Sequence, residues 1–345
     1  MPVFEKIKAL FEANNAFVFY VKPYDNSWNL LSQDSDVLHL FSGQSGFVFM
    51  PFHEGYQVVL PFDKALFSSG ILENLENIST AQHEIIENSE QEYFENLVQL
   101  AKNEIEAKTF KKVVISRKIG IQKSISELQT FQKLLHFYPT AFRYLFFHPK
   151  IGLWMGATPE QLLKTQNTDF ETVALAGTQL FSENLRWNEK EIEEQQLVTD
   201  YIISELQSQN ITATVTDYKT IKAGNLAHIK ATISGVLPDT KSIEDVLKIL
   251  HPTPAVCGFP KGKALDFILL NENYNRQYYT GFLGEFEMNK HTDLFVNLRC
   301  LEVEKESCSI YVGCGITKDS DPKSEYQETQ NKSETMRSIL VYKNT

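Results

Sequence analysis

The sequence predicts an α+β fold in which antiparallel sheets are flanked by helices. Short apolar runs bounded by turn residues occupy the first part of the 345-residue chain, and from about Gln91 onward such runs alternate with segments of helical periodicity. The last strand-like runs follow one another through short loops, as strands do in antiparallel hairpins. No Pro-, Gly- or Ser-rich linker, internal repeat or low-complexity segment divides the chain. We therefore expect one domain, residues 1–345, with two internal lobes.

The expected elements follow from the periodicity of apolar residues. Strands are predicted at Ala16–Val21, Val37–Phe41, Gly46–Phe52, Tyr56–Phe62, Val113–Ser116, Phe142–Phe147, Leu153–Met155, Thr172–Gly177, Ile211–Tyr218, His228–Gly235, Tyr278–Phe286, Leu294–Val303 and Ser307–Ile316. Helices are predicted at Gln91–Lys108, Ser126–Phe137, Trp187–Gln207, Ser242–Leu250, Gly262–Asn271 and Pro322–Val341.

Composition excludes several classes of protein. A net charge of −11 argues against a nucleic-acid-binding surface, which is normally basic. No stretch approaches the roughly 18 apolar residues of a membrane helix, and the amino terminus shows no secretory signal. The four cysteines have no zinc-type or Cys-x-x-Cys spacing. We expect a cytoplasmic monomer with buried thiols, no membrane contact and no nucleic-acid partner.

The final predicted helix carries acidic residues on its apolar face. Asp321-Pro322 is a helix start signal. Glu325, Glu328 and Lys332 follow at i, i+3 and i+7 and share that face. Such carboxylates need a cation, a metal or hydrogen-bond donors if they are buried. A solvated face with a Glu328–Lys332 ion pair is the alternative.

The helix from Trp187 repeats this pattern. Glu191 and Glu194 share a stripe with Val198 and Tyr201, while the other carboxylates of the helix point away. Two inward-facing carboxylate pairs on separate helices would suit a hard cation, most plausibly Mg²⁺, which takes one or two protein carboxylates and leaves positions for water and substrate. An acidic solvated surface is again the alternative.

Three further segments contain candidate functional residues. The loop His251–Pro260 has three prolines and buriable apolar residues, so it suits either a stiff wall of a ligand site or a rigid connector. Lys112 stands at the start of an apolar strand, where a surface lysine is the simpler interpretation. Glu160 follows Gly156-Ala157-Thr158-Pro159 and is expected in the first turn of a helix, where a negative charge is stabilised.

A smaller group of residues would suit an anionic ligand. Arg299 interrupts an otherwise apolar strand and offers a bidentate fork for a carboxylate. The glycines of Gly313-Cys314-Gly315 and of Ala176-Gly177-Thr178 allow close approach of a ligand to backbone N–H groups, although glycines alone are a weak signal.

These segments together resemble the chorismate-utilising enzymes, and isochorismate synthases in particular. The similarity covers about Gln91 to Ile339, within the motif-bearing region 91–340, and residues 1–90 are less diagnostic. Its motifs are Lys112-Val113-Val114-Ile115-Ser116-Arg117, Gly156-Ala157-Thr158-Pro159-Glu160, Glu191-Ile192-Glu193-Glu194-Gln195, the loop His251–Pro260, and Glu325-x-x-Glu328-x-x-x-Lys332. The chain departs from the family at Gln195, where histidine is usual.

The resemblance implies a role for each candidate. Lys112 would be the general base that activates water, and Glu160 the general acid for the departing C4 hydroxyl. Glu194 and Glu328 would bind Mg²⁺ directly, with Glu191 and Glu325 supporting them. Substrate would contact Gly177, Thr178, His251, Tyr279, Arg299, Gly313, Gly315 and Lys332.

The resemblance also favours one branch of the family. Ammonia-using branches generally lack lysine at the position of Lys112, so water is the expected nucleophile, and no glutamine amidotransferase subunit is expected. The implied reaction is Mg²⁺-dependent isomerisation of chorismate to isochorismate, for menaquinone or siderophore biosynthesis. Salicylate synthase, which also eliminates pyruvate, is the alternative within the family. A non-catalytic, metal-dependent binder of an anionic metabolite is the alternative from another class.

Overall fold

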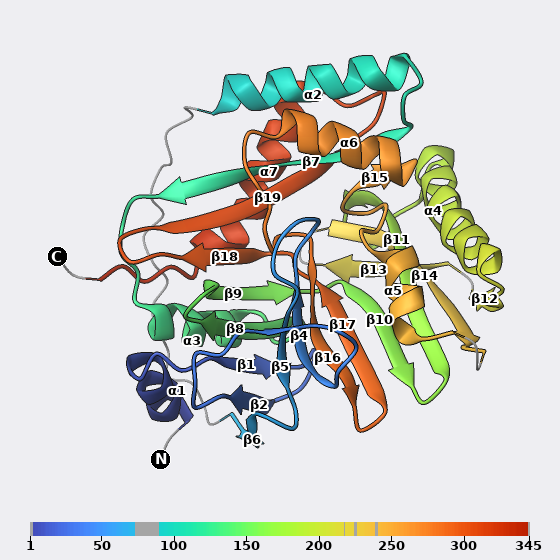
Figure 1. Ribbon diagram of the computed structural model, residues 1–345. Helices are drawn as coiled ribbons and strands as arrows, with labels where there is room; N and C mark the ends of the chain where they lie inside the picture. Colours follow the sequence, from blue (N-terminus) through green and yellow to red (C-terminus); the bar gives the residue numbers. More distant parts are fainter. Residues whose placement is uncertain (1–2, 73–89, 217, 224–225, 239–240, 344–345) are drawn as a thin grey trace.

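Two antiparallel sheets form the framework of the computed structural model, which describes residues 3–72, 90–216, 218–223, 226–238 and 241–343 (Figure 1). Every pairing between their strands is antiparallel in this part of the chain, and helices cover the outer faces. The predicted α+β class is confirmed.

The first sheet has the strand order β15-β7-β19-β18-β9-β8-β1-β2-β6 among the described residues. Its strands are β1 Phe17–Val21, β2 Ser27–Ser32, β6 Leu66–Ile71, β7 Lys112–Ile121, β8 Phe142–His148, β9 Gly152–Thr158, β15 Gly258–Phe259, β18 Cys300–Val303 and β19 Cys308–Ile316. β15 is only two residues long, so most of β7 lies at an edge of this sheet.

The second sheet has the order β12-β14-β11-β10-β17-β16-β4-β5-β3, and β13 also pairs with β14. Its strands are β3 His39–Leu40, β4 Gly46–Met50, β5 Val58–Pro61, β10 Gln161–Gln166, β11 Asp169–Leu180, β12 Ala213–Val215, β13 Lys219–Ala223, β14 Leu226–Val236, β16 Phe282–Met288 and β17 His291–Val296.

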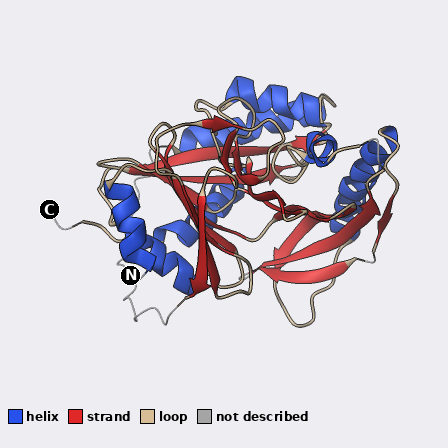
Figure 2. Cartoon of the chain, turned by 60° about the horizontal axis from the view of Figure 1, so that its bottom comes forward, coloured by secondary structure: helices blue, strands red, loops and turns tan. Residues whose placement is uncertain are grey.

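The helices bury their apolar faces on the outer sides of the sheets, so the strands run through the middle of the molecule (Figure 2). They are α1 Val3–Glu12, α2 Gln91–Glu106, α3 Glu127–Phe137, α4 Glu189–Ser208, α5 Ile243–Leu250, α6 Lys261–Asn271 and α7 Pro322–Arg337. Helices α2, α6 and α7 pack near β7 and β19, while α4 and α5 cover the second sheet (Figure 1). None of the described helices is long and apolar enough to span a lipid bilayer.

Aromatic rings fill the space between the two sheets. Phe49 stacks on Tyr278 with ring centroids 4.1 Å apart, and Phe142 stacks on Phe295 at 4.4 Å. Each large buried ring removes some 150–250 Å² of surface from water, so this layer contributes strongly to holding the sheets together.

A buried ionic cluster also links the sheets. Lys22 follows β1 in the first sheet, and its Nζ lies 2.7 Å from Glu285 Oε2 and 3.4 Å from Asp293 Oδ2 in the second. Tyr20 donates a hydrogen bond of 2.6 Å to Glu285 Oε1. One lysine thus compensates two nearly buried carboxylates.

We predict that Lys22→Met lowers the free energy of unfolding by about 3 kcal/mol, because it leaves two buried carboxylates without their cation. Denaturant unfolding measures the loss. Lys150→Met is the matched control, since its ion pair with Asp36 is exposed and should contribute less than about 1 kcal/mol. Equal losses in the two variants would contradict this role of the cluster.

The sequence predicted most elements, but three differences affect the site. The helix expected after Pro159 is absent, and strand β10 begins at Gln161 instead. The predicted strand Leu294–Val303 divides into β17 in the second sheet and β18 in the first, because the chain crosses between sheets around Arg299, whose φ is +48°. The last helix ends at Arg337 rather than Val341. Helix α1 and strands β2, β6, β10, β13 and β15 were not predicted.

Candidate active site

A cavity of about 550 Å³ lies where β7, β19, β11, α4 and α7 approach one another. Most of the residues predicted from sequence line it: Lys112, Glu160, Gly177, Glu191, Tyr279, Arg299, Gly313, Gly315, Glu325, Glu328 and Lys332. These residues come from segments far apart in the chain, so the fold has brought the predicted motifs to one place.

Lys112 is the first residue of β7 and lies over Gly315 of the neighbouring β19. A Cβ added at Gly315 would lie 3.0 Å from Lys112 Cε, so glycine leaves room for the lysine side chain there. Val114, two residues along β7, shares this face and also lines the cavity. The predicted strand start at Lys112 is confirmed.

Glu160 lies in the turn between β9 and β10, so its predicted place at a helix N-terminus is wrong. Two hydrogen bonds hold this turn: Val296 N–H donates to Glu160 O at 2.9 Å, and the Thr158 hydroxyl donates to Val296 O at 2.6 Å. Burial raises the pKa of Glu160 from 4.5 to about 7, although the charges of Lys112 and Lys332 oppose the shift. A large protonated fraction near neutral pH is what a general acid needs.

Arg299 and Lys332 supply positive charge to the cavity. Arg299 Nη1 donates to Lys332 O at 3.0 Å and Thr335 Oγ1 at 3.3 Å, and burial lowers the pKa of its guanidinium. Lys332 Nζ lies 2.6 Å from Glu328 Oε1 and donates to Gly313 O at 3.0 Å. This group of cations suits a small molecule that carries carboxylates.

The two acidic helices reach this cavity from different sides. Glu325 and Glu328 belong to α7, and Glu191 belongs to α4. Burial raises the pKa of Glu325, and its Oε2 is buried without a hydrogen-bond partner in the part of the chain that the structure describes. Glu191 Oε2 accepts the Asn188 backbone N–H at 3.1 Å, as in a capping box.

The unpartnered oxygen of Glu325 is the observation that fits a bound cation at this wall. Within the described residues, no three His, Cys, Asp or Glu side chains form a metal-binding group by themselves.

Three predicted residues are not among those that line the cavity in the described part of the chain. His251 lies outside the cavity, and its Nε2 is 3.1 Å from the Phe52 carbonyl oxygen. Burial lowers the pKa of its imidazole to about 4. The side chains of Thr178 and Glu194 lie outside the described part of the chain, so their predicted contacts stay predictions. The proline-rich loop still forms part of the wall through Ala255 and Val256.

Thr280 and Tyr311 also line the cavity, although the sequence did not single them out. Tyr311 stacks on Tyr279 with ring centroids 5.5 Å apart and shares one face of β19 with Gly313 and Gly315. Because every second residue of a strand points to the same face, Tyr311 could have been predicted from its position two residues before Gly313.

The profile of the family described as "Chorismate binding enzyme" matches residues 64–341. The chain belongs to this family. The match covers most of the chain and includes every predicted site residue.

Two curated relatives illustrate its range. This chorismate-binding enzyme is 32% identical over 198 residues to the salicylate biosynthesis isochorismate synthase of Pseudomonas aeruginosa, covering 54% of the chain and 42% of the relative. It is 25% identical over 262 residues to anthranilate synthase component 1 of Thermococcus kodakarensis, covering 72% of the chain and 59% of the relative. The chain thus spans about half the length of the curated relatives it matches.

A solved structure shares the fold over its whole length. The putative 2,3-dihydroxybenzoate-specific isochorismate synthase of Bacillus anthracis superposes with a TM-score of 0.79 at 22% identity, covering 98% of this chain and 99% of that one. At this identity the likeness concerns the fold of the chorismate-binding enzyme and not its reaction.

Proposed function

We propose that this chorismate-binding enzyme is an isochorismate synthase, an isomerase that moves the ring hydroxyl of chorismate from C4 to C2. The observation that carries the proposal is the joint presence of Lys112 and Glu160 in one cavity, with the pKa of Glu160 raised to about 7. Relatives named as isochorismate synthases support the choice of reaction.

The charges of the cavity suit chorismate, which carries two carboxylates. Arg299 and Lys332 would bind these groups, since a guanidinium and an ammonium in a partly desolvated site attract anions strongly. Tyr279, stacked on Tyr311, would form an apolar wall for the ring. The proposal requires no second protein, because water is the nucleophile.

Two proton transfers complete the reaction. Lys112, as the general base, accepts a proton from water as the water oxygen forms a bond to C2. The ring double bonds shift as the C4–O bond breaks, and Glu160 donates its proton to the leaving hydroxyl, which departs as water. One water enters and one leaves, so the product is an isomer of the substrate.

We propose that Mg²⁺ is the cofactor and that Glu194 and Glu328 bind it, with Glu191 and Glu325 supporting them. The buried, unpartnered oxygen of Glu325 supports this position. The ion would neutralise a substrate carboxylate and fix its orientation. Gln195 stands where the family usually has histidine, and its Nε2 donates to Ala174 O at 2.9 Å. This amide therefore supports the backbone of β11, and the proposal gives it no part in holding the ion.

Glu328→Gln is expected to raise the Mg²⁺ concentration needed for half-maximal rate by about tenfold, since loss of a single ligand or support costs affinity on that scale. A magnesium titration of the initial rate measures the change. Glu334→Gln on the same helix is the control, because Glu334 pairs with Arg337 and does not line the cavity. An unchanged titration for Glu328→Gln would exclude it as a ligand.

Incubation with chorismate and Mg²⁺ in the absence of ammonia, followed by chromatography, tests the proposed function. Isochorismate as the sole product agrees with it. Salicylate plus pyruvate would instead identify a salicylate synthase. No consumption of a tightly bound chorismate would indicate a non-catalytic binder.

A further inference from the structure

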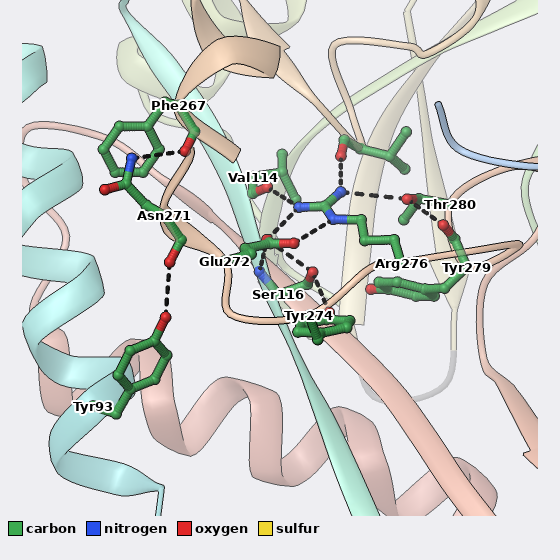
Figure 3. Close-up of polar contacts among 11 residues, drawn as sticks. Tyr93, Val114, Ser116, Phe267, Asn271, Glu272, Tyr274, Arg276, Tyr279 and Thr280 are labelled. Carbon is green, nitrogen blue, oxygen red and sulfur yellow. Dashed lines mark hydrogen bonds and ion pairs between the residues drawn. The ribbon is translucent and has the colours of Figure 1, made fainter. Parts of the chain in front are cut away.

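A buried ion pair lies directly behind the cavity wall. Arg276 and Glu272 each have a side chain 2% exposed, and Arg276 Nη2 lies 2.6 Å from Glu272 Oε1 (Figure 3). Arg276 Nε donates to Glu272 Oε2 at 2.8 Å, so the pair is bidentate. The guanidinium also lies 4.5 Å from the centroid of the Phe52 ring, which fixes its plane.

The remaining hydrogen bonds of Arg276 reach three separate segments of the wall. Nη2 donates to Val114 O at 2.7 Å and Nη1 to Thr280 Oγ1 at 3.3 Å (Figure 3). Nη1 also donates to Val256 O at 2.9 Å. Val114, Val256 and Thr280 all line the cavity. One side chain therefore connects strand β7, the proline-rich loop and the segment before β16.

Glu272 accepts hydrogen bonds from Ser116, which lies two residues after Val114 on β7. Its Oε1 accepts Ser116 N–H at 2.7 Å and Ser116 Oγ–H at 2.9 Å, and Ser116 Oγ lies 2.6 Å from the Tyr274 hydroxyl (Figure 3). The neighbouring strand β15 pairs with β7 at Lys112 and Val113, and Val114 N–H donates to Cys257 O at 2.8 Å. Further along β7, the Glu272 carboxylate accepts the Ser116 N–H and the Arg276 guanidinium donates to the Val114 carbonyl. These side chains thus satisfy backbone groups that a longer partner strand would otherwise pair.

This arrangement has a consequence for Lys112. Lys112, Val114 and Ser116 are every second residue of β7, so their side chains share one face of the strand. The ion pair fixes the backbone at Val114 and Ser116. A buried ion pair is weak evidence for stability, because the cost of desolvating both charges offsets much of their attraction. A role in fixing the geometry of β7 explains the position of this ion pair better than a contribution to stability does.

We propose that Arg276 and Glu272 are positioning residues that hold Lys112 and the proline-rich loop in the geometry needed for water attack. This inference rests on the proposed function. A displacement of a reacting group by about 1 Å can cost around 100-fold in rate, so a backbone shift at the start of β7 would act on kcat rather than on substrate affinity.

A comparison of Arg276→Lys with Arg143→Lys tests the proposal. Arg143 is also buried and also donates to backbone carbonyls, those of Leu135, Lys22 and Asp25, but none of these residues lines the cavity. Arg276→Lys is expected to lower kcat about 10- to 100-fold with little change in KM. Arg143→Lys is expected to lower the melting temperature while kcat stays near the wild-type value. Equal kcat values in the two variants would overturn the proposal, as would a loss that falls entirely in KM.

A double-mutant cycle separates positioning from general damage. If Arg276 acts through Lys112, Arg276→Lys adds little further loss to Lys112→Ala; a full additional loss in that background would contradict the inference. Should Arg276→Lys fail to fold, Tyr274→Phe removes only the hydroxyl that bonds Ser116, and its kcat should fall severalfold with KM retained; an unchanged kcat counts against the proposal. Absence of chorismate turnover by the wild-type enzyme would reject the proposed function itself, whereas turnover that the variants leave intact rejects only the positioning role.

Discussion

Lys112→Ala is expected to lower kcat for chorismate conversion by about 10²–10⁴-fold, the usual contribution of a positioned general base. The side chain lies over Gly315 at the wall of the cavity, and its removal takes away the group that accepts the proton of the attacking water. Steady-state kinetics at saturating chorismate measure the loss, and calorimetric titration checks that Mg²⁺-dependent binding of chorismate is kept.

Lys111→Ala is the matched control. Lys111 precedes Lys112 in the chain but contacts the Phe259 ring, 5.6 Å from its Nζ to the centroid, and does not line this cavity. Its replacement should leave kcat near the wild-type value. Full activity in Lys112→Ala would eliminate Lys112 as the assigned base.

Glu160→Gln is expected to reduce kcat by a similar factor, about 10²–10⁴-fold. Glutamine keeps the size and the hydrogen-bonding capacity of the side chain but has no acidic proton to give to the C4 hydroxyl. Glu127→Gln, whose wild-type carboxylate forms an ion pair with Lys343 away from the cavity, should be indistinguishable from wild type. A Glu160→Gln variant with normal kcat would exclude Glu160 as the acid.

The pKa of Glu160 sets a direction for the pH profile. Because burial raises that pKa to about 7, the protonated form dominates below pH 7 and is lost as the pH rises through this value. The wild-type kcat/KM profile should therefore contain an ionisation near pH 7, and this ionisation should disappear from the residual activity of Glu160→Gln. A wild-type profile without an ionisation near pH 7 would contradict the assignment.

Local signals were sufficient where an element is defined by its own sequence. The start of α7 was predicted from Asp321-Pro322, and in the structure Asp321 Oδ1 accepts the Ser324 N–H at 2.9 Å. Spacing placed Glu325, Glu328 and Lys332 on one face of that helix, and the apolar run after Lys112 indicated the beginning of β7. Those features account for much of the cavity wall.

Pairing between strands and contacts between segments distant in the chain determined the features that could not be predicted from the sequence. The run Leu294–Val303 contains no glycine or proline to mark a break, yet its two halves pair with β10 and β9 in different sheets. Thr158-Pro159-Glu160 is equally compatible with a helix start and a turn between strands, and the pairing of β10 with β17 selects the turn. Arg276 lies in a polar stretch without a motif, because its partners at Val114 and Val256 are distant in the chain.

The origin of the product hydroxyl distinguishes water attack from every alternative that keeps the substrate's own oxygen. The protein is incubated with chorismate and Mg²⁺ in H₂¹⁸O without ammonia, and the product is examined by mass spectrometry. Water attack assisted by Lys112 and Glu160 predicts isochorismate with one ¹⁸O at its C2 hydroxyl. Unlabelled isochorismate would mean direct transfer of the substrate's own hydroxyl, and it would contradict the assigned mechanism.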